Sequence, residues 1–132
     1  MNAVFADTFF FLALLNERDA AHTKAIQFDA TARLLVTTAW VLTELGDALS
    51  APENRPAFLQ LLETLQNSPD ARIVGPAPEL FERGLELFRQ RTDKEWSLTD
   101  CISFVAMKDE RITDTLTGDR HFEQAGFHAL LK

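Results

Sequence analysis

The segment Val4-Phe5-Ala6-Asp7-Thr8 places an aspartate and a threonine directly after a short apolar run. Such a run, followed by a residue that caps helices well, predicts a buried strand that ends where a helix begins. The next residues, Phe9 to Leu15, are apolar enough to form a mostly buried helix. Asp7 is therefore expected at the carboxyl end of a strand, which is the edge of an open parallel sheet where ligands bind.

The rest of the chain continues this alternation of short strands and helices. Aliphatic and β-branched runs predict four more strands, at residues 34–38, 72–74, 112–116 and 127–131. The spacing of apolar residues predicts helices at residues 20–32, 39–49, 57–66, 78–91, 97–108 and 120–124. This order predicts an α/β fold with a parallel sheet and helices on both faces. With 132 residues and no repeat or linker, one domain over residues 1–132 is expected.

Three further acidic residues also lie next to apolar runs. They are Glu44 in Leu42-Thr43-Glu44-Leu45, Asp100 in Trp96-Ser97-Leu98-Thr99-Asp100-Cys101, and Asp119 in Leu116-Thr117-Gly118-Asp119-Arg120-His121-Phe122. Together with Asp7 they can converge at one edge of the predicted sheet. Carboxylates gathered near apolar surroundings repel one another unless a cation lies between them. A set of oxygen ligands, with no Cys or His at ligand spacing, suits Mg²⁺ or Mn²⁺ and points to metal-assisted chemistry on phosphate esters.

Each of these acids also has a purely structural alternative. Asp7 and Asp119 could serve only as helix N-caps, a role that aspartate fills well. Asp100 could only close a capping box with Ser97, and Glu44 could be a solvated residue on a helix face. The site hypothesis therefore depends on the fold bringing the acids together.

The composition limits the class of protein and its surroundings. The net charge is −7 and the isoelectric point is about 4.9, whereas nucleic-acid-binding surfaces are usually basic. Divalent cations at an acidic cluster would reverse the local sign of the charge. The chain contains one cysteine, so an internal disulfide is excluded. No signal peptide and no apolar run long enough for a membrane helix are visible, and we expect a cytoplasmic protein with no membrane contact.

Taken together and in this order, these segments resemble the PIN domain family of metal-dependent ribonucleases, and most of all the small VapC-type proteins of bacteria and archaea. The most specific segments are Trp96 to Cys101 and Thr117 to Phe122, and Asp19-Ala20-Ala21-His22 also looks like family sequence. The resemblance extends from Asp7 to Phe127. It implies a three-layer α/β/α domain around a mostly parallel central sheet. It also implies Mg²⁺- or Mn²⁺-dependent cleavage of RNA, commonly by the toxin of a toxin–antitoxin pair and commonly by a homodimer.

The resemblance matches Asp7, Glu44, Asp100 and Asp119 to the acidic metal-binding positions of the family. In the mechanism that we expect, Asp7 and Asp100 bind the metal directly and Asp119 binds it directly or through water. Glu44 orients a water on the metal or acts as the general base. The substrate is RNA, and an antitoxin protein is the expected partner. Two alternatives remain, a PIN-like interaction module without catalysis and a metal-dependent phosphohydrolase that acts on another phosphate ester.

Four neighbouring residues have expected supporting roles. Thr8 and Thr117 match the small hydroxyl positions, where their hydrogen bonds would hold the carboxylates in place. His121 could contact the substrate, because histidine can bind phosphate or move protons near neutral pH, although it could equally pack or cap locally. Arg120, next to it, is a further candidate for substrate contact.

Several other residues have two interpretations. Trp96 could stack on a base or anchor the loop before its helix, and we favour anchoring. His22 is expected to pack or cap locally, and Cys101 to be a small core residue. An apolar helix surface could cover the sheet or form a dimer or antitoxin interface. It is made by Phe58, Leu61, Leu62 and Leu65.

Overall fold

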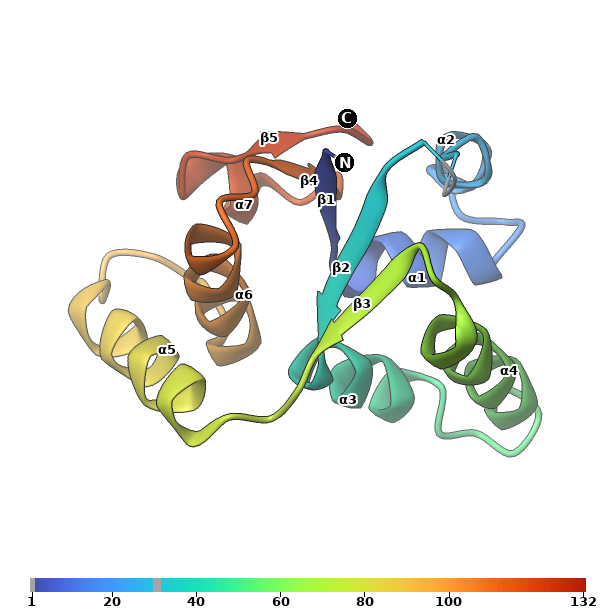
Figure 1. Cartoon of the computed structure of the whole chain (residues 1–132), viewed down its shortest axis with the longest axis horizontal. Helices are drawn as coiled ribbons and strands as arrows, with labels where there is room; N and C mark the ends of the chain where they lie inside the picture. The colour runs from blue at the N-terminus through green and yellow to red at the C-terminus, as the bar shows by residue number, and fades with distance from the viewer. Residues whose placement is uncertain (1, 30–31) are drawn as a thin grey trace.

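The computed structural model describes residues 2–29 and 32–132. At its centre is a five-stranded parallel sheet in the order β3-β2-β1-β4-β5 (Figure 1). The predicted α/β class with a parallel sheet is thus confirmed. The strands are β1 (Ala3–Ala6), β2 (Leu34–Thr38), β3 (Ala71–Val74), β4 (Asp114–Leu116) and β5 (His128–Ala129).

Helices lie on both sides of this sheet. In Figure 1, α1, α2 and α4 lie on one side and α5, α6 and α7 on the other, while α3 continues beyond the end of β2. This arrangement confirms the expected α/β/α layers. The helices are α1 (Thr8–Leu15), α2 (His22–Ile26), α3 (Ala39–Ala48), α4 (Arg55–Asn67), α5 (Pro78–Gln90), α6 (Leu98–Asp109) and α7 (Arg120–Gln124). No helix among the described residues is long and apolar enough to span a membrane.

The strand order reverses beside β1. From β1 the chain moves outward through β2 to β3 and then returns to place β4 on the other side of β1. Parallel pairing aligns Phe5 with Thr115 and Ala6 with Leu116, so β1 and β4 end side by side. In open α/β sheets a ligand binds at such a reversal, beyond the carboxyl ends of the strands. The residues that follow Ala6 and Leu116 are therefore placed at this position.

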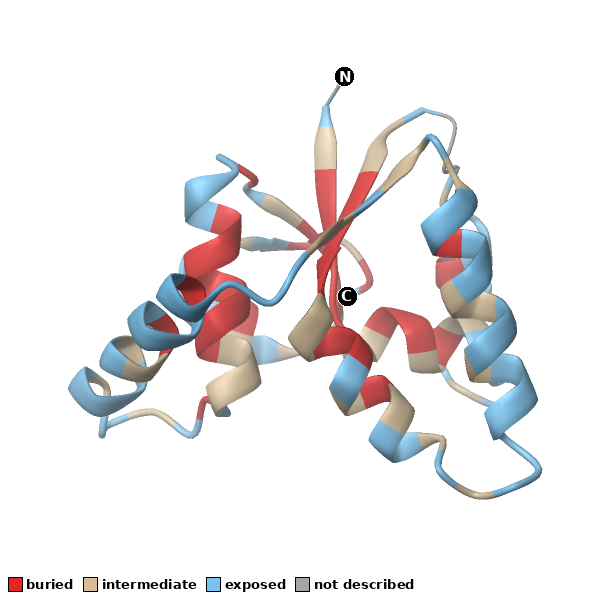
Figure 2. Cartoon of the chain, turned by 60° about the horizontal axis from the view of Figure 1, so that its bottom comes forward, coloured by how far each residue is buried: buried red, intermediate tan, exposed pale blue. Residues whose placement is uncertain are grey.

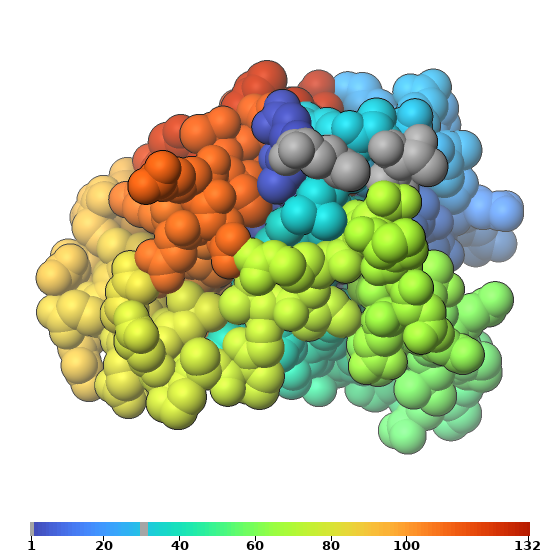
Figure 3. Space-filling view, viewed as in Figure 1, coloured from blue at the N-terminus to red at the C-terminus, as the bar shows by residue number. Residues whose placement is uncertain are grey.

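The core is built around β1 and α6. Val4, Phe5 and Ala6 are fully buried because strands flank β1 on both edges and helices cover both faces. On the face shown in Figure 3, the start of the chain, in dark blue, reaches the surface. Every residue from Cys101 to Met107 is buried, and Figure 2 shows α6 as an almost continuous buried helix. The buried part of α6 begins directly after its half-buried first turn, Leu98 to Asp100.

A close approach between α5 and α6 completes this layer. A side chain at Gly84 of α5 would collide with Ile102 of α6, both at its Cγ1 and at its backbone. Glycine is needed here because of the short distance between the two helices, and not for an unusual backbone conformation. This close contact holds α6 beside α5 and so helps to fix the position of Asp100 in the first turn of α6.

Two predicted elements differ in length from the observed ones. The helix predicted at residues 20–32 is only α2. It begins at His22 because the Asp19 side chain accepts a hydrogen bond from Ala21 N at 2.8 Å and caps a turn before the helix. Residues 27–29 are not helical, and residues 30 and 31 of that prediction lie outside the described residues. The strand predicted at residues 127–131 is only β5. The other elements agree with the predictions to within about two residues at each end.

Candidate active site

Asp7 follows β1 and lies at the reversal of the strand order. It is the N-cap of α1, and its Oδ1 accepts a hydrogen bond from Phe10 N at 3.2 Å. Its other carboxylate oxygen, Oδ2, accepts from Thr117 Oγ1 at 2.8 Å. The residue is only 7% exposed, which is unusual for an aspartate without an ionic partner. Capping alone therefore does not account for its burial.

The surroundings of Asp7 oppose its negative charge. Burial raises the pKa of Asp7 to about 7, and the hydrogen bonds from Thr117 and Phe10 only partly offset that effect. The nearby charges of Asp100 and Asp119 raise the pKa further. The three carboxylates are thus close enough to destabilise one another.

Thr117 links two of these acids. Its hydroxyl donates to Asp7 and also accepts a hydrogen bond from Asp119 N at 3.1 Å. The side chain is completely buried, so both hydrogen bonds are shielded from water. Since Thr117 follows β4 directly, the pairing of β1 with β4 brings these groups together across 110 positions in sequence.

Asp100 reaches the same place from α6. It occupies the third position of that helix, where its side chain accepts from Ser97 N at 3.3 Å and completes a capping box. Burial is the main cause that raises the pKa of Asp100, and the charge of Asp119 adds to it. Asp100 can therefore cap α6 and belong to the acidic cluster at the same time, because its Oδ2 faces both Ser97 and His121.

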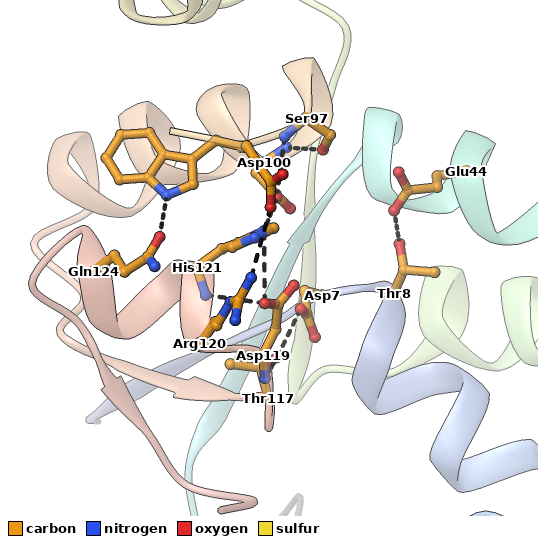
Figure 4. Close-up of polar contacts among 12 residues, drawn as sticks. Asp7, Thr8, Glu44, Ser97, Asp100, Thr117, Asp119, Arg120, His121 and Gln124 are labelled. Atoms are coloured by element: carbon orange, nitrogen blue, oxygen red, sulfur yellow. Dashed lines mark hydrogen bonds and ion pairs between the residues drawn. The ribbon is translucent and has the colours of Figure 1, made fainter. Parts of the chain in front are cut away.

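Asp119 and His121 complete the cluster from the start of α7. Asp119 is the N-cap of α7 and accepts from His121 N at 2.9 Å. The imidazole Nδ1 of His121 lies 3.2 Å from Asp100 Oδ2 and 3.6 Å from Asp119 Oδ1. One ligand atom from each of these three residues lies within 4.8 Å of the other two. Figure 4 shows their side chains pointing toward one another, with Asp7 beside Asp119.

Glu44 lies apart from this cluster, on α3. Its carboxylate Oε1 accepts a short hydrogen bond from Thr8 Oγ1, and Figure 4 shows this pair on the opposite side of Asp7 from His121. The group of close ligand atoms formed by Asp100, Asp119 and His121 includes neither Glu44 nor Asp7, but Asp7 shares Thr117 with Asp119, and the charges of Asp100 and Asp119 raise its pKa. The structure thus brings three of the four predicted acids together and places the fourth next to them through Thr8. Thr8 holds Glu44, whereas Thr117 holds Asp7 and Asp119.

The donor set fits a divalent metal ion. Within residues 2–29 and 32–132, no lysine or arginine lies within ion-pairing distance of Asp7, Asp100 or Asp119. Carboxylates that are partly or fully buried without such a partner are the oxygen ligands that Mg²⁺ and Mn²⁺ prefer. His121 lies close enough to offer a nitrogen to the same cluster, a neighbour that the predicted set of oxygen ligands did not include.

Residues with two interpretations are resolved by their contacts. Trp96 is buried, makes an edge-to-face contact with Phe104 and donates from Nε1 to Gln124 at 3.0 Å, so it anchors the loop. His22 Nδ1 lies 2.8 Å from Ala13 O, which confirms a local role. Arg120 is exposed and pairs with Glu95 at 3.6 Å. Cys101 is fully buried, as expected of a core residue, and burial raises the pKa of its thiol to about 11.

Sequence reasoning missed one supporting residue. Thr37 is completely buried at the end of β2, and its hydroxyl donates to Ala6 O at 2.8 Å. It thus fixes the peptide that precedes Asp7. A pair of threonines, Thr37-Thr38, at the end of an otherwise aliphatic strand was the available signal, since a buried hydroxyl needs a partner.

The geometry of this site agrees with a comparison against protein families. The family model described as PIN domain matches residues 4–128. The chain belongs to the PIN domain family. The resemblance inferred from the sequence segments is therefore confirmed. No curated protein matches this PIN domain significantly.

Solved structures similar to this PIN domain share its fold over nearly the whole length. VapC20 from Mycobacterium tuberculosis, described as a sarcin-ricin loop cleaving toxin, is 27% identical with a TM-score of 0.84, and the match covers 95% of this chain and 96% of that one. VapBC2 from Rickettsia felis, solved with a promoter DNA fragment, is 13% identical with a TM-score of 0.69 and 96% coverage of both chains. FitAcB from Neisseria gonorrhoeae is 18% identical with a TM-score of 0.63, covering 96% of this chain and 95% of that one.

Proposed function

We propose that this protein is a metal-dependent endoribonuclease that acts in the cytoplasm as the toxin of a VapBC-type toxin–antitoxin pair. The observation that carries the proposal is the convergence of Asp7, Asp100 and Asp119 where β1 and β4 end, without a lysine or arginine partner among the described residues. Membership of the PIN domain family supports a nuclease, and the similarity to VapC20 supports RNA as its substrate.

In this proposal Asp7, Asp100 and Asp119 hold Mg²⁺ or Mn²⁺. Such an ion supplies neutralisation of the carboxylates and Lewis-acid polarisation of the phosphate. Thr117 keeps the carboxylate of Asp7 in place and holds the backbone of Asp119, so these two ligands are positioned before the ion binds. Burial disfavours the ionised form of Asp7, and a positive charge nearby would favour it.

The proposal also assigns roles in proton transfer and substrate binding to Glu44, His121 and Arg120. Glu44 is half-buried and held by Thr8, and we assign it the role of general base toward the attacking water. His121 directs Nδ1 to Asp100, which leaves Nε2 for a substrate phosphate. Arg120, exposed at the start of α7, would contact the RNA backbone.

Two protein partners are part of the proposal. An antitoxin partner is supported by the similarity of the fold to VapBC2 and FitAcB. A homodimer is proposed as well. Phe58, Leu61 and Leu62 pack against the main core and Leu65 belongs to it, which favours a covering role for this surface over an interface. Phe81 and Phe88 on α5 are instead exposed by 36% and 45% and offer an apolar surface for either partner.

The experiment compares substrates and metals with purified protein. A sarcin-ricin loop hairpin RNA, tRNA, single-stranded DNA and a generic phosphodiester are incubated with Mg²⁺, Mn²⁺ or EDTA. We expect cleavage of at least one RNA with metal and none in EDTA. The Asp100→Asn variant should lose cleavage, whereas Asp47→Asn, an exposed acid on α3, should keep it as the matched control. Cleavage of the generic ester or DNA but no RNA would instead support a different phosphohydrolase, and no cleavage with normal folding would support an interaction module.

A further inference from the structure

A pocket of about 340 Å³ adjoins the acidic cluster and has no role in the mechanism above. Gly118 in its wall lies between Thr117 and Asp119, and Phe9, also in its wall, follows Asp7 by two residues. The pocket and the acidic cluster therefore share the two segments that follow β1 and β4. A pocket of this size falls in the range of about 300–1,000 Å³ that small-molecule ligands occupy.

An aromatic ring forms one wall of this pocket. A Cβ atom at Gly118 would lie 2.7 Å from Cζ of Phe9, so only glycine allows the ring to rest on the backbone at this point. The ring is held there by the packing of α1 and is half-buried. An aromatic ring at a fixed position in an open pocket is the surface on which nucleic acid bases stack, with little dependence on base identity.

Two lysines, Lys24 and Lys132, line the same pocket together with one acid, Asp19, whose carboxylate accepts a hydrogen bond from Ala21 N. Lys24 is exposed on α2 and donates from Nζ to Lys132 O at 2.8 Å, which leaves two of its three N–H groups for other acceptors. Lys132 also lines the pocket and pairs through Nζ with Glu123 at 2.7 Å. Lys24, in contrast, pairs with no carboxylate side chain among the described residues. Its ammonium group provides a place for a phosphate next to a site that otherwise repels it.

We propose that this pocket binds the nucleotide next to the cleaved phosphodiester bond, with its base on Phe9 and its phosphate near Lys24. This inference rests on the proposed RNA cleavage. It explains how an acidic chain can position RNA. The metal site receives the phosphate to be cleaved, and the adjacent pocket holds the neighbouring nucleotide by stacking and by a local positive charge.

The first test removes one base at a time from the substrate. The cleavage position is mapped on the RNA that the wild-type protein cleaves fastest, and single abasic nucleotides are then placed at each flanking position. We expect kcat/KM to fall by about tenfold at one position beside the cleaved bond, since stacking contributes about 1–3 kcal/mol per base. In Phe9→Leu, which keeps an apolar side chain but no ring, this penalty should disappear.

The second test changes the charge of the pocket. Lys24→Glu should raise KM by about threefold or more with little change in kcat, because it contacts a phosphate that does not react. Lys108→Glu makes the same change of charge on an exposed residue in the last turn of α6, far from the pocket, and should leave KM unchanged. This variant pair decides the question even if Phe9→Leu does not fold.

The possible results separate this inference from the proposed function. If the wild-type protein cleaves RNA but the abasic penalties are equal in wild type and Phe9→Leu, or if Lys24→Glu and Lys108→Glu behave alike, only the pocket assignment is overturned. If the wild-type protein cleaves no RNA with either metal, the proposed function fails and the pocket assignment fails with it.

Discussion

Replacing the buried carboxylate of Asp7 by an amide should stabilise the metal-free protein at alkaline pH. Burial raises the pKa of Asp7 from its ordinary value of 3.8 to about 7. This difference of roughly 3 pH units corresponds to roughly 4 kcal/mol for ionising Asp7 in the folded chain, at about 1.4 kcal/mol per unit. Asp7→Asn removes this cost but loses the hydrogen bond from Thr117, which contributes roughly 1–3 kcal/mol when it is buried. The expected net gain is roughly 1–3 kcal/mol at about pH 8.

The pH dependence of the stability difference between Asp7→Asn and wild type distinguishes the cost of ionising Asp7 from other effects of the substitution. Because the folded pKa is raised, the folded chain still binds a proton that the unfolded chain has released between about pH 4 and pH 7, so the stability of the wild type falls as pH rises through that window. Asp7→Asn has no such group. Its free energy of unfolding relative to wild type should therefore rise by roughly 2 kcal/mol between about pH 5.5 and about pH 8. Burial also raises the pKa of Asp100, and this lowers the stability of both wild type and Asp7→Asn as pH rises.

Urea denaturation in EDTA at these two pH values measures the difference directly, and Asp47→Asn serves as the control for loss of an exposed charge. Adding Mg²⁺ or Mn²⁺ should make wild type more stable than Asp7→Asn, because an ion that binds only the folded wild type raises its stability. The reasoning is refuted if Asp7→Asn is less stable than wild type at about pH 8 in EDTA, or if the difference between the two proteins does not change with pH.

Three further predictions concern single residues. Gly84→Ala should lower the free energy of unfolding by roughly 1–3 kcal/mol, because its methyl group would collide with Ile102; a chemical denaturation curve with unchanged stability would contradict the close packing of α5 and α6. Thr117→Val should destabilise the fold by roughly 1–3 kcal/mol and weaken metal binding measured by calorimetry, since Asp7 loses a donor inside the core; unaltered metal affinity would show that this hydroxyl does not position the ligands. Glu44→Gln should reduce kcat by about 10²-fold or more while metal binding is retained, and a variant with normal kcat would exclude Glu44 as the general base.

The sequence was sufficient for most elements because their signals are local. The run Val4-Phe5-Ala6 predicted a buried strand, as observed, and the capping pattern of Ser97 with Asp100 marked the start of α6 correctly. The alternation of strands and helices then predicted the parallel sheet. The helix predicted at residues 20–32 begins late because the side chain of Asp19 competes with the helix for a backbone N–H, and hydrophobic spacing does not report such competition.

The sequence also pointed to four candidate acids, since each lies next to an apolar run. Asp7, Asp100 and Asp119 lie where an element begins or ends, whereas Glu44 lies within α3. Their relative positions depend on long-range pairing. The alignment of Ala6 with Leu116 brings Asp7 to Thr117, and the packing of α6 brings Asp100 to His121. Glu44 remains apart because α3 holds it against Thr8. A local pattern can place a carboxylate at the end of a strand, but only the tertiary structure decides which carboxylates share a low-dielectric space, because repulsion and burial depend on distance in space and not in sequence.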